Sequence, residues 1–239
     1  AGLDNDGKEI TVAGEKLTTY DPVTGDVISS YGKSKSSDFF TYAAKGALSY
    51  VIGGKMRVYA NVGYFSDAPT FTQAFISPRT RNSLVNGLNN VSTFTADVNY
   101  QYSQSGYALR VTGYYTTIKD QSDVMSFYDD LQNSFTNFAL SGIDQRNAGV
   151  EMGFKVPTFV ENLSVQGALS YGKYIYTSNP HMTQTVDNSS EVTIDNQLLP
   201  YWKSTPIYKR NTDGTLSNVI DHYKEHYVPS TPQLAGSLG

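Results

Sequence analysis

The fold is decided by the stretch FTYAAKGALSY at residues 40–50. From Phe40 to Tyr50, every second residue is apolar or small, and the residues between them are small or polar. Side chains that alternate with a period of two point to opposite faces of a β-strand. A Gly53–Gly54 turn follows, and MRVYANVGY at residues 56–64 repeats the pattern. The two stretches therefore predict a β-hairpin with one apolar face and one polar face.

The same alternation recurs along the rest of the chain and predicts about seven strands. The first six lie at about residues 39–51, 55–66, 91–102 and 107–121, at a stretch that ends with residues 150–154, and at residues 163–176. A seventh strand begins near His222 and contains Val228 and Leu234.

The connections between these strands alternate in length. Short connections fall at residues 52–55, 104–106 and 157–162, and long ones at residues 67–90, 122–138 and 178–221. In an up-and-down transmembrane barrel, the short turns lie at the periplasmic rim and the long loops at the external rim. A soluble β-sandwich gives no reason for all long loops to lie at one end.

We therefore expect an all-β fold, an antiparallel up-and-down segment of a transmembrane β-barrel. Seven strands cannot close without leaving free edges, and bacterial single-chain barrels have even strand numbers, so the segment belongs to a larger barrel. Residues 1–38, which are polar and rich in turn signals, are expected to form an extracellular loop region. Residues 39–239 are expected to hold the barrel strands, their periplasmic turns and their extracellular loops.

Composition narrows the classes of function. The net charge of -4 argues against nucleic acid as a partner, because phosphate neutralisation needs clustered Lys and Arg. The absence of cysteine excludes a disulfide scaffold and a thiolate metal site. The sequence has no run of about 18 apolar residues, so it predicts no transmembrane helix. Barrel strands, in contrast, carry their hydrophobicity in alternation. The polar opening of the chain and its strand-like end lead us to expect a longer protein on both sides.

Several stretches resemble a known family. YANVGYFSDAP at residues 59–69 is similar to the barrels of TonB-dependent outer-membrane transporters, particularly those of Bacteroidetes, where such a strand rises to an external loop. Shorter pieces at residues 99–100, 113–116, 149–153 and 227–233 look like the same family. The resemblance covers most of the chain from about Phe40 onward.

The resemblance implies a barrel of about 22 strands around an N-terminal plug. It implies import of a scarce nutrient across the outer membrane of a Gram-negative bacterium, energised by the TonB complex. The implied partners are outer-membrane lipid, the protein's own plug and remaining strands, and TonB; a surface lipoprotein is a further partner that the resemblance allows. The plug and the segment that contacts TonB are not in this sequence.

Two groups of residues are candidate sites. The polar sides of the strands are expected to face the barrel lumen, where they pair with one another along a water-filled wall or contact the plug. The residues of this lumen-facing set are Arg57, Asp97, Asn99, Arg110, Glu151 and Gln166. In the long external loops, charged and aromatic side chains are candidates for binding substrate. These are Arg79, Arg81, Tyr201 and Trp202.

The sequence carries no catalytic motif, so we expect no enzyme and no cofactor. There is no Gly-x-Ser-x-Gly elbow. His222 and His226 stand four apart, which on a strand separates them by roughly 13 Å, too far to share a metal ion.

The alternative is a secreted β-sandwich that binds carbohydrate or protein. Low charge, abundant tyrosine and absent cysteine suit it equally well. The two folds differ in the surroundings of the apolar side chains, which a sandwich buries between two sheets and a barrel exposes as a continuous band. The deciding residues are Tyr42, Leu109, Val111, Val165 and Leu169.

Overall fold

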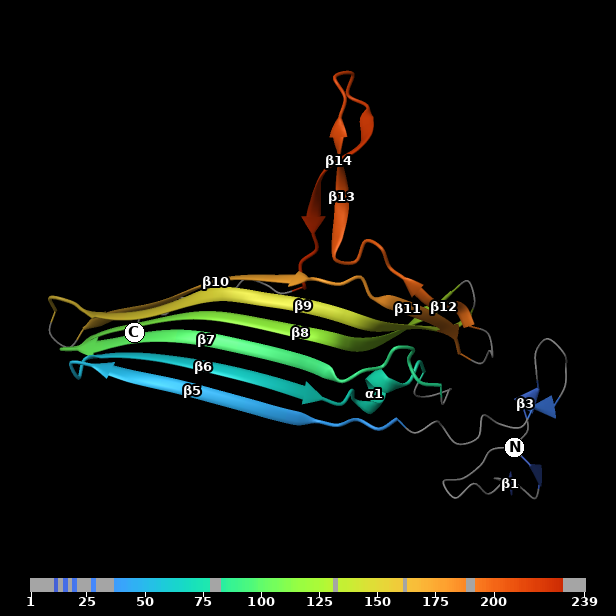
Figure 1. Cartoon of the computed structure of the whole chain (residues 1–239), viewed down its shortest axis with the longest axis horizontal. Helices are drawn as coiled ribbons and strands as arrows, with labels where there is room; N and C mark the ends of the chain where they lie inside the picture. Colours follow the sequence, from blue (N-terminus) through green and yellow to red (C-terminus); the bar gives the residue numbers. More distant parts are fainter. Residues whose placement is uncertain are drawn as a thin grey trace.

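The computed structural model describes residues 37–77, 83–130, 133–160, 163–187 and 192–229. It also describes the backbone of four two-residue strands near the N-terminus, which pair as two small hairpins (Figure 1). These are β1 (Thr11–Val12), β2 (Glu15–Lys16), β3 (Thr19–Tyr20) and β4 (Val27–Ile28). Most of the expected loop region 1–38 lies outside the described residues.

One antiparallel sheet of eight strands dominates the molecule (Figure 1). Its strands are β5 (Tyr42–Ile52), β6 (Met56–Asp67), β7 (Val91–Gln104), β8 (Tyr107–Asp129), β9 (Ser134–Pro157), β10 (Ser164–Tyr176), β11 (His181–Val186) and β12 (Val192–Leu198). Strands β5 to β9 pair in sequence order. β10 then pairs with the later half of β9, and β11, followed by β12, pairs with its earlier half. The sheet is open, and the prediction of an all-β antiparallel fold is confirmed.

The predicted loop at residues 122–138 is wrong, because β8 and β9 continue through most of it. Their hairpin turns only between Asp129 and Ser134. The register of the two strands shifts near Asp120 and again near Gly142, both of which have positive φ angles, 58° and 73°. Such bulges change which residues face the same side of the sheet, and so they interrupt the two-residue period that marks a strand in the sequence.

The predicted loop at residues 178–221 is wrong as well. It holds β11, β12, β13 (Ser204–Arg210) and the first part of β14 (Leu216–Glu225). Polar residues such as Thr183, Gln184 and Thr185 stand on both sides of β11, so no apolar alternation marks it.

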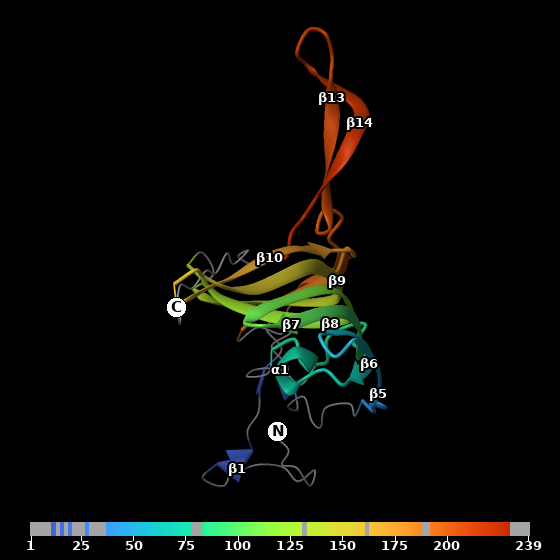
Figure 2. The same cartoon turned by 90° about the vertical axis from the view of Figure 1, so that its left-hand side faces the viewer.

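The predicted seventh strand is correct only in part. β14 contains His222, but it pairs with β13 in a hairpin that stands away from the sheet (Figures 1 and 2). Pairing beside β10 begins at Tyr227, which forms a bridge with Ile175, while the Val228 N–H donates to the Tyr174 carbonyl. Leu234 lies outside the described residues.

The register aligns like residues across six strands. One row of directly paired residues, each on a neighbouring strand, consists of Leu48, Ala60, Val98, Gly113, Val150 and Tyr171. The next row consists of Tyr50, Val58, Tyr100, Val111, Met152 and Leu169. Because directly paired residues point to the same side, these rows form one continuous apolar face. It is open to the outside: Leu48, Val98 and Tyr171 are 81%, 58% and 78% exposed.

The apolar face is the convex one. Lys173, whose side chain is on this side of β10, forms an ion pair with Glu225 of β14, and the β13–β14 hairpin rises from the convex side (Figure 2). The intervening rows, such as Ser49, Tyr59, Asn99, Thr112, Glu151 and Ser170, therefore make a concave polar face. Within the described residues, no second sheet packs on the convex face.

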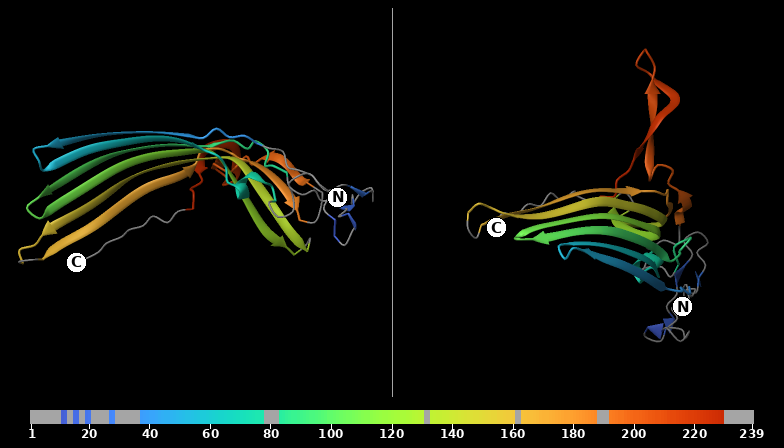
Figure 3. Two further views of the ribbon diagram at one scale, coloured as in Figure 1. Left: turned by 90° about the horizontal axis from the view of Figure 1, so that it is seen from below. Right: turned by 60° about the vertical axis from the view of Figure 1, so that its left-hand side comes forward.

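A small core lies at the long-loop end of the sheet. The short helix α1 (Phe71–Ala74) follows β6, and its N-terminus is closed by Thr70 and Gln73 in a capping box. The segment after it packs Ile76 and Val85 against Ala139 of β9. Figure 3 shows α1 beneath the sheet, near the place where β8 and β9 bend. The long-loop end of the sheet thus packs against a small core, and the rest of the strands form a single uncovered layer.

Aromatic rings cover glycines where the sheet curves. Gly149 and Gly172 are paired neighbours on the concave face, and the Tyr114 hydroxyl lies over both. A Cβ atom at Gly149 would lie 2.5 Å from the Tyr114 hydroxyl oxygen and 2.6 Å from the Tyr171 carbonyl oxygen. A Cβ atom at Gly153, on the same face of the same strand, would meet nothing within 4 Å.

This contrast gives a matched pair of variants. We expect Gly149→Ala to lower the free energy of unfolding by about 1–3 kcal/mol, because the new methyl group clashes with a backbone carbonyl as well as with the phenol. Gly153→Ala should leave stability unchanged or raise it slightly, because the site is open and alanine restricts the unfolded chain. Unfolding of the full-length protein in denaturant, followed by circular dichroism, measures both. Equal effects would mean that Tyr114 does not lie over Gly149.

Candidate functional site

A hydrogen-bonded network centred on Asn99 occupies the middle of the concave face. The side chain of Asn99 is 1% exposed. Its Oδ1 accepts from the Thr112 hydroxyl at 2.7 Å and from Arg110 Nη2 at 3.4 Å. Its Nδ2 donates to Asp97 Oδ1, which also accepts from Asn61 Nδ2 at 2.8 Å. The structure thus joins three of the six predicted lumen-facing residues across β6, β7 and β8.

The other three residues of the lumen-facing set share the same face. Glu151 lies directly beside Thr112, and Glu151 and Arg110 line one cleft of about 400 Å³ with Ser170. Among the described residues, no side-chain hydrogen bond or ion pair is formed by Arg57 or Gln166. The concave face therefore carries both signs of charge, and part of its polar surface is open to an incoming group.

Aromatic residues also line the concave face, which the sequence analysis did not include in its candidate set. The hydroxyls of Tyr114 and Tyr174 are hydrogen-bonded to each other. Farther along, Lys45 Nζ lies 5.0 Å from the centre of the Phe65 ring. The two-residue alternation of their strands assigns these residues to the concave face, and this pattern was the sequence signal that could have identified them.

The predicted substrate-binding residues are only partly placed by the structure. Arg79 and Arg81 lie outside the described residues. Tyr201 is exposed, whereas Trp202 is half-buried and its ring packs on Tyr176 with 5.4 Å between centroids. The Trp202 carbonyl oxygen lies 2.8 Å from His226 Nδ1. Trp202 thus holds the base of the β13–β14 hairpin against the end of β10.

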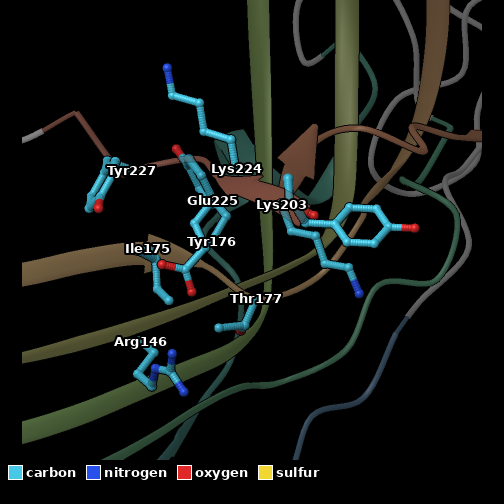
Figure 4. Close-up of a pocket in the computed structure, with 10 residues that line it drawn as sticks. Arg146, Ile175, Tyr176, Thr177, Lys203, Lys224, Glu225 and Tyr227 are labelled. Atoms are coloured by element: carbon cyan, nitrogen blue, oxygen red, sulfur yellow. The ribbon is translucent and has the colours of Figure 1, made fainter. Parts of the chain in front are cut away.

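A second cleft, of about 520 Å³, opens beside this hairpin base on the convex side (Figure 4). It is lined by residues of β9, β10 and the hairpin, among them Arg146, Tyr176, Lys203 and Glu225. No continuous motif marks this cleft in the sequence, because Arg146 and Lys203 are far apart in the chain. The one local signal was that Arg146 interrupts the apolar side of β9.

The β13–β14 hairpin ends in a tight polar turn. Asp213 Oδ1 accepts from the Thr215 hydroxyl at 2.6 Å and from the Thr215 backbone N–H at 2.9 Å. These hydrogen bonds hold the pKa of the Asp213 carboxyl below its usual value, because they favour the charged form. The hydrogen bond from the Thr215 hydroxyl has the largest effect.

Two further features are absent from the described residues. They contain no group of three or more side chains that could hold a metal ion. They also contain no helix that is long and apolar enough to cross a membrane. Comparison of the chain with protein-family models, with curated proteins and with solved structures found no match. The two faces of the sheet are therefore the features that bear on function.

The Asn99 network gives a testable prediction. Asn99→Leu removes the oxygen that accepts from Thr112 and Arg110 and the amide group that donates to Asp97. We therefore expect a loss of about 1–3 kcal/mol in the free energy of unfolding. Gln101→Leu is the control, because Gln101 lies on the same face of the same strand and makes only a long 3.5 Å hydrogen bond to the Tyr59 hydroxyl. It should cost much less in the same denaturation experiment. A similar loss for both variants would show that the network does not stabilise the sheet.

Proposed function

We propose that this chain is part of the barrel of an outer-membrane transporter. The observation that carries the proposal is the continuous, exposed apolar face on the convex side of six strands, opposite a polar concave face. A sheet with this curvature and this division of side chains suits lipid outside and a water-filled lumen inside.

The extent of the apolar face supports a membrane span. On the convex side of β8, side chains are uncharged from Tyr107 to Thr117, and on β9 from Ala148 to Val156. A tilted transmembrane strand needs about 9–11 residues. The eight tyrosines Tyr42, Tyr50, Tyr64, Tyr100, Tyr102, Tyr107, Tyr115 and Tyr171 all lie on this side. Tyrosine is enriched where such a face meets the headgroups.

The exposure of the five deciding residues favours the barrel over the sandwich. Tyr42, Val165 and Leu169 are 50%, 39% and 47% exposed, and Leu109 and Val111 are partly exposed. A β-sandwich that binds carbohydrate or protein would bury these side chains between two sheets. The described residues supply one curved sheet and no partner for it.

The transport activity that we propose is the import of a scarce nutrient, energised by the TonB complex, in the outer membrane of a Gram-negative bacterium. The polar concave face supports this, because a plug that must move for substrate to pass can exchange its hydrogen bonds there with water. The partners would be outer-membrane lipid, the plug and the remaining strands of the same protein, and TonB. The TonB dependence follows from the resemblance of residues 59–69 and the shorter pieces.

Membrane fractionation followed by surface labelling tests the proposal. The full-length protein should fractionate with outer membranes and need detergent for extraction. The described sequence lacks cysteine, so single cysteines can report position. Asp130→Cys and Thr212→Cys, at the tips of the β8–β9 and β13–β14 hairpins, should react with an impermeant maleimide on intact cells. Lys55→Cys, in the turn between β5 and β6, should react only after the outer membrane is breached. Recovery as a stable, detergent-free monomer would refute the proposal.

A pair of charge insertions tests the assignment of faces. Val111→Arg places a charge on the convex face in mid-strand, and we expect it to lower the free energy of unfolding from bilayers by about 2–4 kcal/mol. Thr112→Arg points the same charge to the concave face; it loses the hydrogen bond from Thr112 to Asn99, worth about 1 kcal/mol, but brings no charge into hydrocarbon, so it should cost less. Refolding into lipid vesicles, measured in denaturant, gives both values. Equal costs at the two neighbouring positions would mean that the convex side does not meet lipid.

A further inference from the structure

The charged residues of the convex face have one sign and one location. In the paired rows that run from Gln104 and Tyr107 to Ser92 and Lys119, the charged side chains on this face are Lys119, Arg146 and Lys173. All three are cations, and all lie toward the long-loop end of their strands. Asp97 and Glu151, the carboxylates of the same rows, point to the concave side.

The three cations follow a diagonal line across the sheet. Arg146 pairs with Thr117, two residues before Lys119, and Lys173 pairs with Ala148, two residues after Arg146. The position of the cation thus moves by two residues toward the short-turn end from β8 to β9, and by two more from β9 to β10. A membrane surface crosses tilted strands along such a diagonal, because it is perpendicular to the barrel axis and the strands are not.

The 520 Å³ cleft lies on this diagonal and has an excess of positive charge. Arg146, Lys203 and Lys224 line it with one carboxylate, Glu225, which already forms an ion pair with Lys173. In Figure 4, Arg146 lies at one end of the cleft, on the sheet, and the two lysines lie at the other, on the hairpin side. Within the described chain, the Arg146 guanidinium has no hydrogen bond or ion pair.

We propose that this cleft binds the phosphorylated headgroup of a glycolipid in the outer leaflet, an inference that rests on the proposed function. The Arg146 guanidinium can donate two parallel hydrogen bonds to the oxygens of a phosphate, and Lys203 adds a second positive charge. The hydroxyl of Thr177, which also lines the cleft, supplies a donor and an acceptor for the sugar. The volume is within the range of small-molecule sites.

The surroundings of the cleft select a lipid as the occupant. Directly toward the short-turn end, the convex face continues with Tyr171 and Val150, which are exposed and apolar. Acyl chains attached to a headgroup in the cleft would lie on this surface. A membrane-bound anion therefore gains both the contacts with the cations and the contacts with the apolar face, whereas a free anion gains only the first.

Binding of a fluorescent lipid A to the full-length protein in detergent micelles tests the proposal. We expect Arg146→Gln combined with Lys203→Gln to weaken the affinity by about tenfold to thirtyfold, because each cation near an anionic surface contributes several-fold. Arg146→Lys keeps the charge and removes the planar fork, so its loss should be intermediate. The control is Lys55→Gln combined with Lys209→Gln, which removes the same charge away from the cleft and should bind like the unaltered protein.

Two further ligands identify the source of the phosphate. Lipid A without its phosphates should bind at least tenfold more weakly, and inorganic phosphate should not displace lipid A at equal concentration. Unchanged affinity in the Arg146/Lys203 variant, or equal binding of the dephosphorylated lipid, would overturn the proposal, and displacement by inorganic phosphate would make the cleft a free-anion site. If the protein fractionates with outer membranes and fails only these assays, the transporter proposal stands and this inference does not.

Discussion

Side chains in a β-strand alternate between the two faces of the sheet, so the structure depends on the register in which its strands pair. From Ile52 paired with Met56 to Tyr171 paired with Val150, the rows of β5 to β10 keep this register without a slip. A shift of one residue in any strand would move its apolar set to the concave face. The same ladder also satisfies the backbone hydrogen-bonding groups of every interior strand, which lipid cannot do.

The bulges near Asp120 and Gly142 divide the molecule into two physical regimes. Between the bulges and the short turns, the sheet is a single layer with both faces open. Between the bulges and the tip of the β8–β9 hairpin, residues are buried on both sides of β9, as Ala139 and Leu140 are. A buried polar cluster lies on this long-loop side of the bulges, where Asp187 Oδ1 accepts from Asn137 Nδ2 at 2.6 Å and from the Ser77 hydroxyl at 3.2 Å. The part toward the long loops therefore has a small core of its own, while the rest of the sheet leaves its apolar face uncovered.

The sequence predicted what depends on the two-residue period and missed what depends on its interruption. β5, β6, β7 and β10 lie close to the predicted strands because each alternates from end to end. The outer halves of β8 and β9 were missed because bulges change the parity, and β11 to β13 because their polar residues stand on both faces. Asp97, Asn99 and Arg110 lie on one face of the sheet, to which the two-residue alternation alone assigns them. The Arg146–Lys203 cleft depends on how the hairpin base packs against β10, which no local pattern encodes.

The two faces of the sheet differ in the charges that they carry, and the proposed surroundings, lipid on the convex side and water on the concave side, account for the difference. On the concave side, Arg110 and Glu151 share a cleft, and Asp97 is held by two amide groups, as suits a wall that water can reach and where both signs are tolerated. On the convex face of the paired rows of the sheet, the charged side chains are the cations Lys119, Arg146 and Lys173, which lie along one diagonal edge. A charge in the middle of that face would have to leave water for hydrocarbon, whereas a cation at its edge keeps water and gains anionic headgroups. In the proposed barrel, the alternation of side chains therefore directs each strand's charges either to the lumen or to the border of the membrane.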